Sequence, residues 1–260
     1  MFIQPISTIL NETTPIFKER DNLWHYYSMS PADLTGATAQ IVTLQDEVNN
    51  GGKNANLLSG SPGGITSALR LHTRITPLTD RAEVAVYFHD TNDGGLFNGM
   101  LFKDMVANGI RFEYSFFKAN VTNGSKEAAP AIKMAVYSPS TGAWNSFVWE
   151  PYLQGTGNPI ENVWVSNVVR NTTGTSNAPT VSEGKGWYSS YFPPTSLGEK
   201  SGSLAAWVAH LKTTIPTVMA DAIVEHVRIG VGSNNPGVTS YVNSLQIAVG
   251  DYDWKWTFGG

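Results

Sequence analysis

The stretch AIVEHVRIGVG, residues 222–232, decides the fold class of this chain. Its β-branched residues recur in near alternation, and the run VTSYVNSLQIAV at 238–249 repeats the pattern. Between the two, residues 233–237 read SNNPG, and Asn, Pro and Gly are residues that turns prefer. Two such runs joined by a turn predict an antiparallel pair of strands, so we expect a mostly β protein.

Similar strand-like runs recur outward from this stretch. The segments 110–117 and 131–137 both alternate and are separated by a polar stretch, which predicts a hairpin near the centre of a sheet. A long polar excursion at 171–185 precedes Trp187, where we expect the same core to resume. Further strands are predicted at 39–45, 67–74, 82–88, 144–149 and 162–169, with a turn at 76–80.

One segment has helical rather than strand-like spacing. In residues 204–211 the large apolar side chains fall on one face, and Ser201 or Ser203 can cap the first turn. The whole pattern predicts an all-β fold, a two-sheet antiparallel jelly-roll sandwich with one short helix near 204–211. We expect a single domain over residues 1–260, with 1–27 as an N-terminal lead-in, because sandwiches of about 200–250 residues often form one domain.

The amino-acid composition limits the classes of binding partner that we expect. Of the 260 residues, 41% are hydrophobic, which suffices for a continuous core, and only 15% are charged, below the ~25% of an average globular protein. A net charge of −4 leaves no basic field for phosphates, so nucleic acid is not an expected partner. The chain has no cysteine, which excludes disulfides and thiolate metal sites. The surface is therefore expected to be covered by neutral polar groups.

Targeting signals are not recognisable in the sequence. Residues 1–10 lack a basic segment and a long apolar run, so we do not expect them to be a signal peptide. No segment has the ~20 apolar residues of a membrane span. The compartment stays open, with an extracellular, cell-surface or virion location favoured.

The order of elements after residue 204 resembles the C-terminal part of bacterial concanavalin-A-like lectin and glucanase sandwiches. In that family the final strand usually reads Gly-x-x-x-Tyr-Val-Asp-x-Val. Gly237, Tyr241 and Val242 match this pattern, and Asn243 stands where Asp is common. The resemblance covers about a fifth of the chain and implies a jelly-roll sandwich. The family contains sugar binders, glycanases, lyases and structural modules, so the resemblance does not choose among them.

Catalytic motifs of such folds are incomplete. Glycosidases need two carboxylates, about 5 Å apart in retaining enzymes, and the family's Glu-x-Asp-x-x-Glu strand is absent. Glu83, Glu113 and Glu225 each stand alone in strand-like runs, and Glu150 lies at a strand end. The segments 81–84 and 116–119 resemble two strands of an alginate lyase group, without its Gln-Ile-His strand. A lyase or hydrolase is therefore only the second alternative.

Aromatic clusters are the best candidates for sugar contacts, because sugar rings stack on aromatic faces while amides and carboxylates bind the hydroxyls. Such clusters occupy 144–149, 187–192 and 251–256, and alternation puts about half of each inside the core. We expect the exposed rings to follow the polar excursion and precede Pro193-Pro194. The predicted glycan-binding residues are Trp187, Tyr188, Tyr191, Trp144 and Asn145.

One stretch of the sequence is a candidate for binding a cation. Asp90, Asn92 and Asp93 precede two glycines and offer clustered oxygens that suit Ca²⁺, although the same residues suit an ordinary hairpin turn. The five histidines lack zinc-ligand spacing. No cofactor is expected, apart from possible calcium at these three residues.

Two functions of different class fit these observations. The first is a non-catalytic carbohydrate-binding module whose partner is a glycan or polysaccharide. The alternative is a structural or assembly protein, such as a virion decoration or appendage subunit, because a surface of low charge lowers the cost of contacts in a homo-oligomer.

Overall fold

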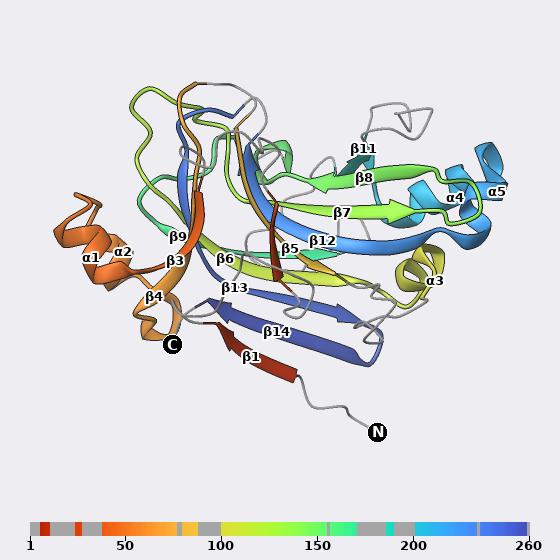
Figure 1. Cartoon of the computed structure of the whole chain (residues 1–260), viewed down its shortest axis with the longest axis horizontal. Coiled ribbons are helices and arrows are strands. Elements are labelled where there is room, and N and C mark those ends of the chain that lie inside the picture. The colour runs from red at the N-terminus through yellow and green to blue at the C-terminus, as the bar shows by residue number, and fades with distance from the viewer. Residues whose placement is uncertain are drawn as a thin grey trace.

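The structure is a computed structural model in which two layers of strands pack against each other (Figure 1). Buried apolar residues from both layers form one large core cluster between them. The structure describes residues 6–10, 24–27, 38–76, 80–87, 100–154, 157–170, 186–189, 201–232 and 235–258.

The first layer, sheet A, is built around the long strand β13 (Thr239–Val249). Strand β6 (Arg111–Lys118) pairs along one edge of β13. On the other edge β4 (Ser67–His72) pairs with the first residues of β13 and β14 (Tyr252–Phe258) with the last, so the sheet forks. The outer strands are β3 (Thr38–Thr43) on β4, β9 (Trp164–Arg170) on β6, and β1 (Ile6–Leu10), which runs parallel to β14.

The second layer, sheet B, has the strand order β11-β10-β8-β7-β12-β5-β2, and its described pairs are antiparallel. Apolar side chains alternate along these strands, and one set faces sheet A in the core. The bounds are β2 (Trp24–Tyr27), β5 (Arg81–Tyr87), β7 (Ala131–Tyr137), β8 (Trp144–Trp149), β10 (Trp187–Ser189), β11 (Ser201–Gly202) and β12 (Ile223–Gly232).

The two runs that decide the fold class are both strands, but they do not pair with each other. Strand β12 lies in sheet B between β5 and β7, and β13 lies in sheet A. The predicted hairpin of these two strands is therefore wrong. In the connection between them, the backbone at Gly232 has a φ of +135° and at Gly237 a φ of +66°, conformations that suit glycine. The chain crosses between layers here because both strands have an apolar face to bury, and opposite sheets bury both faces in one core.

The predicted hairpin of β6 and β7 is wrong for a related reason. Strand β6 lies in sheet A and β7 in sheet B, so the segment 119–130 connects the two layers. That connection is longer than the two to five residues of a usual hairpin loop. The real hairpin joins β7 to β8, where the amide of Ser138 donates to the carbonyl oxygen of Ala143 at 2.9 Å.

The predicted helix is confirmed and extends to α4 (Leu204–Thr214). The Ser203 hydroxyl caps it by accepting a hydrogen bond from the Ala206 amide at 3.0 Å. Several other short helices were not predicted. Helix α1, for example, begins at Leu44, whereas the sequence predicted that the strand continues to Gln45. They are α1 (Leu44–Asn49), α2 (Asn56–Ser59), α3 (Phe102–Ala107) and α5 (Pro216–Asp221), with 3₁₀ turns at Pro62–Gly64 and Pro151–Gln154.

Helices α1 and α2 cover part of the outer face of sheet A. Leu44, Leu57 and Tyr241 belong to a second, smaller apolar cluster there. The Tyr241 hydroxyl donates to Glu47, which also binds Arg70 at 2.8 Å. Tyr241, a residue of the lectin-like pattern, thus holds a helix against the sheet. No helix of the described residues is long and apolar enough to cross a membrane.

Candidate functional site

Two of the predicted sugar-binding residues are core residues. Trp187 is 1% exposed, its ring centroid lies 5.6 Å from that of Phe112, and its indole nitrogen donates to the Arg170 carbonyl at 3.3 Å. The expectation that this ring is exposed is therefore wrong, because alternation along β10 turns Trp187 inward. Asn145 is also fully buried, and its side-chain oxygen accepts from the Ser189 hydroxyl at 3.0 Å.

The other predicted residues separate into two groups. Tyr188 and Trp144 are half-buried and lie on the face of sheet B that is turned away from the core. The remaining ring and the proposed calcium ligands lie outside the described residues. They are Tyr191, Asp90, Asn92 and Asp93.

This outer face of sheet B carries a group of charged side chains. In β5, β12 and β7 the residues that alternate with the core set include Glu83, Arg228 and Lys133, and the register places Arg228 directly opposite Lys133. Glu83 is fully buried and Arg228 is 3% exposed. Together with Tyr188 and Glu150, described below, these three side chains form what we call the sheet B site.

The carboxylate of Glu83 lies between two cations. Lys133 donates to one of its oxygens, and Arg228 donates to the other at 3.2 Å. Burial alone would raise the pKa of this carboxyl, but the charges of Lys133 and Arg228 outweigh burial and hold the pKa below its ordinary value. Glu83 is therefore ionised at neutral pH and does not act there as a proton donor.

Gly230 makes this arrangement possible. It lies directly opposite Glu83 in the β5–β12 pair, on the same outer face. A Cβ atom at this position would lie 2.5 Å from Cγ of Glu83. Glycine therefore leaves the space through which Glu83 reaches Lys133 and Arg228.

A second polar pair lies toward the β10 side of the site. The Tyr188 hydroxyl donates to the carboxylate of Glu150 at 3.1 Å. Burial, and then the Glu150 charge, raise the pKa of Tyr188 well above the ordinary tyrosine value, and Glu83 contributes in the same direction. Tyr188 therefore stays protonated as a hydrogen-bond donor. Since both Glu83 and Glu150 act on Tyr188, the sheet B site brings together two acids that stand far apart in the sequence.

Histidine is also present on this face. His226 lies two residues before Arg228 on β12 and is buried. Burial lowers its pKa most, although the neighbouring Glu225 at 3.2 Å acts in the opposite direction. The imidazole is therefore mainly neutral at neutral pH.

Reasoning from the sequence missed this charged group and treated Glu83 as solitary. The available signal was a charged residue in the middle of each of three apolar strands: Glu83 in 81–87, Lys133 in 131–137 and Arg228 in 223–232. Such a residue is costly to bury alone, so three of them predict mutual pairing.

The two segments that resemble an alginate lyase do not meet. Arg81 and Glu83 lie on β5 in sheet B, and Lys118 lies on β6 in sheet A. Lys118 is fully buried and donates to the backbone carbonyl of Lys126. The resemblance therefore does not assemble a lyase centre.

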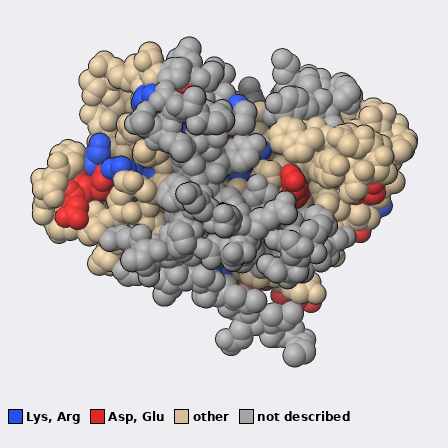
Figure 2. Space-filling model, viewed as in Figure 1, with Lys and Arg blue, Asp and Glu red and all other residues tan. Residues whose placement is uncertain are grey.

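Within the described ranges, no group of three His, Asp or Glu side chains could hold a metal ion. Figure 2 shows few charged side chains on the described part of the visible face, and acidic and basic groups gather mainly beside α1 and α2. The described part of this visible face is therefore mostly uncharged.

Comparison with known proteins gives a likeness of fold only. No family model and no curated protein matches the chain. An exo-β-agarase structure matches with a TM-score of 0.40 and 10% identity over 89% of this chain, which spans only 23% of that protein. The adhesin domain of Lys-gingipain from Porphyromonas gingivalis matches with a TM-score of 0.30 and 10% identity, covering 87% of this chain and 90% of that one.

A third solved structure is CBM27-1 of Caldicellulosiruptor saccharolyticus in complex with mannohexaose. Its TM-score is 0.32 and its identity 12%, covering 84% of this chain and 86% of that one. The solved structures that resemble this chain thus include an agarase and a protein in complex with mannohexaose.

Proposed function

We propose that the chain binds a polysaccharide on the outer face of sheet B and does not turn it over. The observation that carries this proposal is the state of the polar groups there: Glu83 is held ionised between Lys133 and Arg228, and Tyr188 is held protonated against Glu150. Groups fixed in one protonation state do not exchange protons near neutral pH, as acid–base catalysis requires. They remain good donors and acceptors for hydroxyl groups.

The exposure of the site supports binding at its rim. Glu83 and Arg228 form a buried floor, whereas Lys133, Tyr188 and Glu150 are half-buried. A ligand hydroxyl at this rim meets the ammonium group of Lys133 and the phenol of Tyr188, which strands carry, and the carboxylate of Glu150, which directly follows β8. Groups set by strands lose little conformational entropy on binding, which favours affinity.

The test is calorimetric titration with mannan, agarose oligosaccharides, alginate and β-glucan, with product assays run in parallel. We expect saturable binding to at least one of these without product. Tyr188→Phe should weaken that binding by about fivefold to tenfold, the effect of one lost hydrogen bond. Tyr252→Phe is the matched control, because Tyr252 is 47% exposed on sheet A, and it should bind as the parent does.

Three results would contradict the proposal. Equal affinity in the Tyr188 and Tyr252 variants would remove the sheet B site as the binding surface. Accumulation of cleaved product would make the protein an enzyme. No binding to any of the four, with a defined oligomer by light scattering, would favour the assembly alternative.

A further inference from the structure

We propose a second binding site, for a neutral saccharide, in a recess at the end of sheet A. The recess has a volume of about 510 Å³ and is formed by three segments: 72–76 at the end of β4, 122–124 after β6, and Gly237 before β13. Small-ligand sites commonly occupy ~300–1,000 Å³. His72 lies on the outer face of sheet A, so this recess belongs to the opposite layer from the sheet B site.

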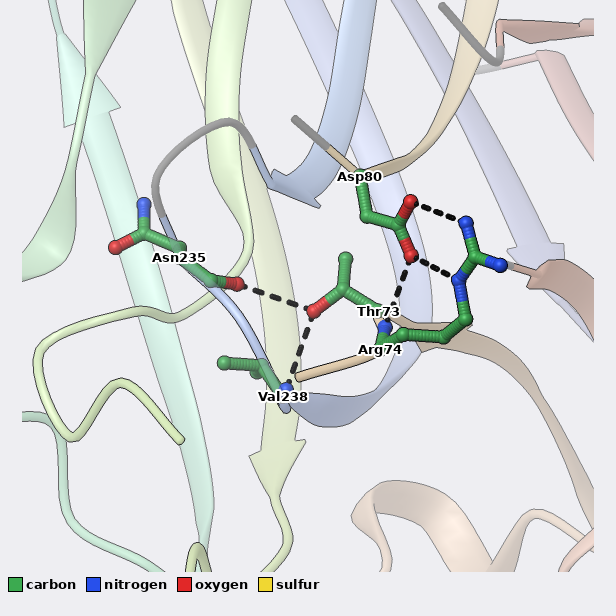
Figure 3. Close-up of polar contacts among 5 residues, drawn as sticks. All are labelled: Thr73, Arg74, Asp80, Asn235 and Val238. Atoms are coloured by element: carbon green, nitrogen blue, oxygen red, sulfur yellow. Dashed lines mark hydrogen bonds and ion pairs between the residues drawn. The ribbon is translucent and has the colours of Figure 1, made fainter. Parts of the chain in front are cut away.

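The segments that form the recess are tied to one another (Figure 3). The buried Thr73 hydroxyl donates to the Asn235 carbonyl at 3.1 Å and accepts from the Val238 amide at 3.1 Å. The Gly237 amide donates to the Arg74 carbonyl at 2.8 Å. These bonds fix the segment after β4 against the one before β13.

The turn after β6 is held by close backbone contact. A Cβ atom on Gly124 would lie 2.5 Å from the carbonyl oxygens of Gly237 and Pro236, and one on Gly237 would lie 3.1 Å from Cγ1 of Ile75. The Ser125 amide also donates to the Pro236 carbonyl at 2.8 Å. The recess is therefore preformed, which reduces the entropy cost of binding.

The charges around the recess are already neutralised. Arg74 forms a two-pronged ion pair with the buried Asp80, with both nitrogen–oxygen distances 2.8 Å (Figure 3). His72 bonds the Thr239 hydroxyl through Nδ1 at 2.9 Å, and burial, followed by the Arg70 charge, lowers its pKa. An anionic or cationic ligand thus finds no opposite charge left over from these pairs.

The remaining walls carry uncharged polar groups, and most of their exposed surface is apolar. Thr76, Thr122 and Asn123 are exposed and supply hydroxyl and amide groups, and Ile75 is 53% exposed. A pyranose ring has the matching character, with hydroxyls around its edge and C–H groups on its faces. The chemistry of the recess therefore fits a neutral sugar better than a charged ligand.

The test is a two-dimensional ¹H–¹⁵N NMR titration with mannohexaose, agarohexaose and cellohexaose as separate probes. We expect at least one to shift the amides of Ile75, Gly124 and Gly237. Ile75→Arg and Asn123→Ala should each weaken that binding by about fivefold or more, and added salt should change it little because no charge is involved.

Matched controls exist outside the recess. Ile160 is 64% exposed and Asn158 is exposed, so Ile160→Arg and Asn158→Ala make the same chemical changes elsewhere and should bind as the parent does. The inference is overturned if none of the three probes shifts the recess amides, or if the recess variants and their controls bind equally. Shifts confined to Tyr188 and Gly230 would overturn it while leaving the sheet B proposal intact.

Discussion

Glu83 and Gly230 lie directly opposite each other in strands β5 and β12, and a Cβ atom on Gly230 would come within 2.5 Å of Cγ of Glu83. It would also lie 2.6 Å from the carbonyl oxygen of Ala82. The glycine is therefore required by close approach and not by an unusual backbone conformation. The Glu83 carboxylate depends on it to reach Lys133 and Arg228.

We first predict that Gly230→Ala lowers the free energy of unfolding by about 1–3 kcal/mol, the usual cost of overpacking. Urea unfolding of the two proteins measures this difference. In the double variant with Glu83→Ala, Cγ is absent, so part of the clash is relieved and the two effects should not add. Strict additivity would show that Gly230 and Glu83 do not compete for this space.

The second prediction concerns the charge of Glu83. Glu83→Gln leaves Lys133 and Arg228 without their buried carboxylate, so we expect a loss of about 3–5 kcal/mol in the free energy of unfolding at pH 7. Because the folded-state pKa is lowered, the contribution is present above the unfolded pKa of about 4.3 and fades as pH falls through the folded value. The difference in the free energy of unfolding between the parent and Glu83→Gln should therefore become smaller as the pH is lowered.

The control for this variant is Glu113→Gln. The Glu113 side chain is 35% exposed and pairs with Arg111 at 3.2 Å. An exposed pair of this kind contributes about 0–1 kcal/mol, so the control should unfold nearly as the parent does. Similar losses in both variants would mean that burial does not distinguish the Glu83 cluster.

The third prediction concerns the ion pair beside the recess of sheet A. The carboxylate of Asp80 accepts from the Arg74 side chain and from its backbone amide at 3.1 Å, and the side-chain bond is the main reason that the pKa of Asp80 is lowered. Hydrogen exchange of the Arg74 amide should be slow at pH 7 and faster in Asp80→Asn. Its protection in the parent should be lost as pH falls through the lowered pKa, because protonation removes the charge.

A surface carboxylate provides the comparison. Asp253 accepts from Gln246 at 2.9 and 2.8 Å and is 24% exposed. Asp253→Asn should leave the exchange of the Arg74 amide unchanged. If Asp80→Asn also leaves the exchange of the Arg74 amide unchanged, the ion pair between Arg74 and Asp80 does not stabilise the backbone at Arg74.

Tyrosine ionisation is the subject of the fourth prediction. Burial, then the Glu150 charge, keep the pKa of Tyr188 far above the ordinary value, and the same two causes raise the pKa of Tyr152 to about 12. Ultraviolet titration to about pH 11, above the ordinary tyrosine value of ~10, should give the same phenolate signal for the parent and for Tyr188→Phe. A smaller signal in the variant would show that Tyr188 ionises and is not held as a donor.

By itself, the sequence determined most of the long strands and where the main helix begins, although β11 and β14 were not among the predicted strands. The alternation in 222–232 and 238–249 is real, and Ser203 caps α4 as a serine before an apolar face should. These features are local, because the repeat of side-chain directions and the capping bond involve residues close in the chain. Helix α1 was not predicted because its apolar side packs against Tyr241, a residue far away in the sequence.

Only the tertiary structure decided which strands pair and which side chains meet. Strand β12 pairs with β5 on one edge and β7 on the other, and β13 belongs to the other sheet, because pairing depends on contacts between residues far apart in the chain. Alternation predicts that Trp187 and Tyr188 face opposite ways, and only the position of sheet A shows that Trp187 faces inward. The sheet B site is likewise assembled from separate strands, and such long-range contacts leave no periodic signal in any one stretch of the chain.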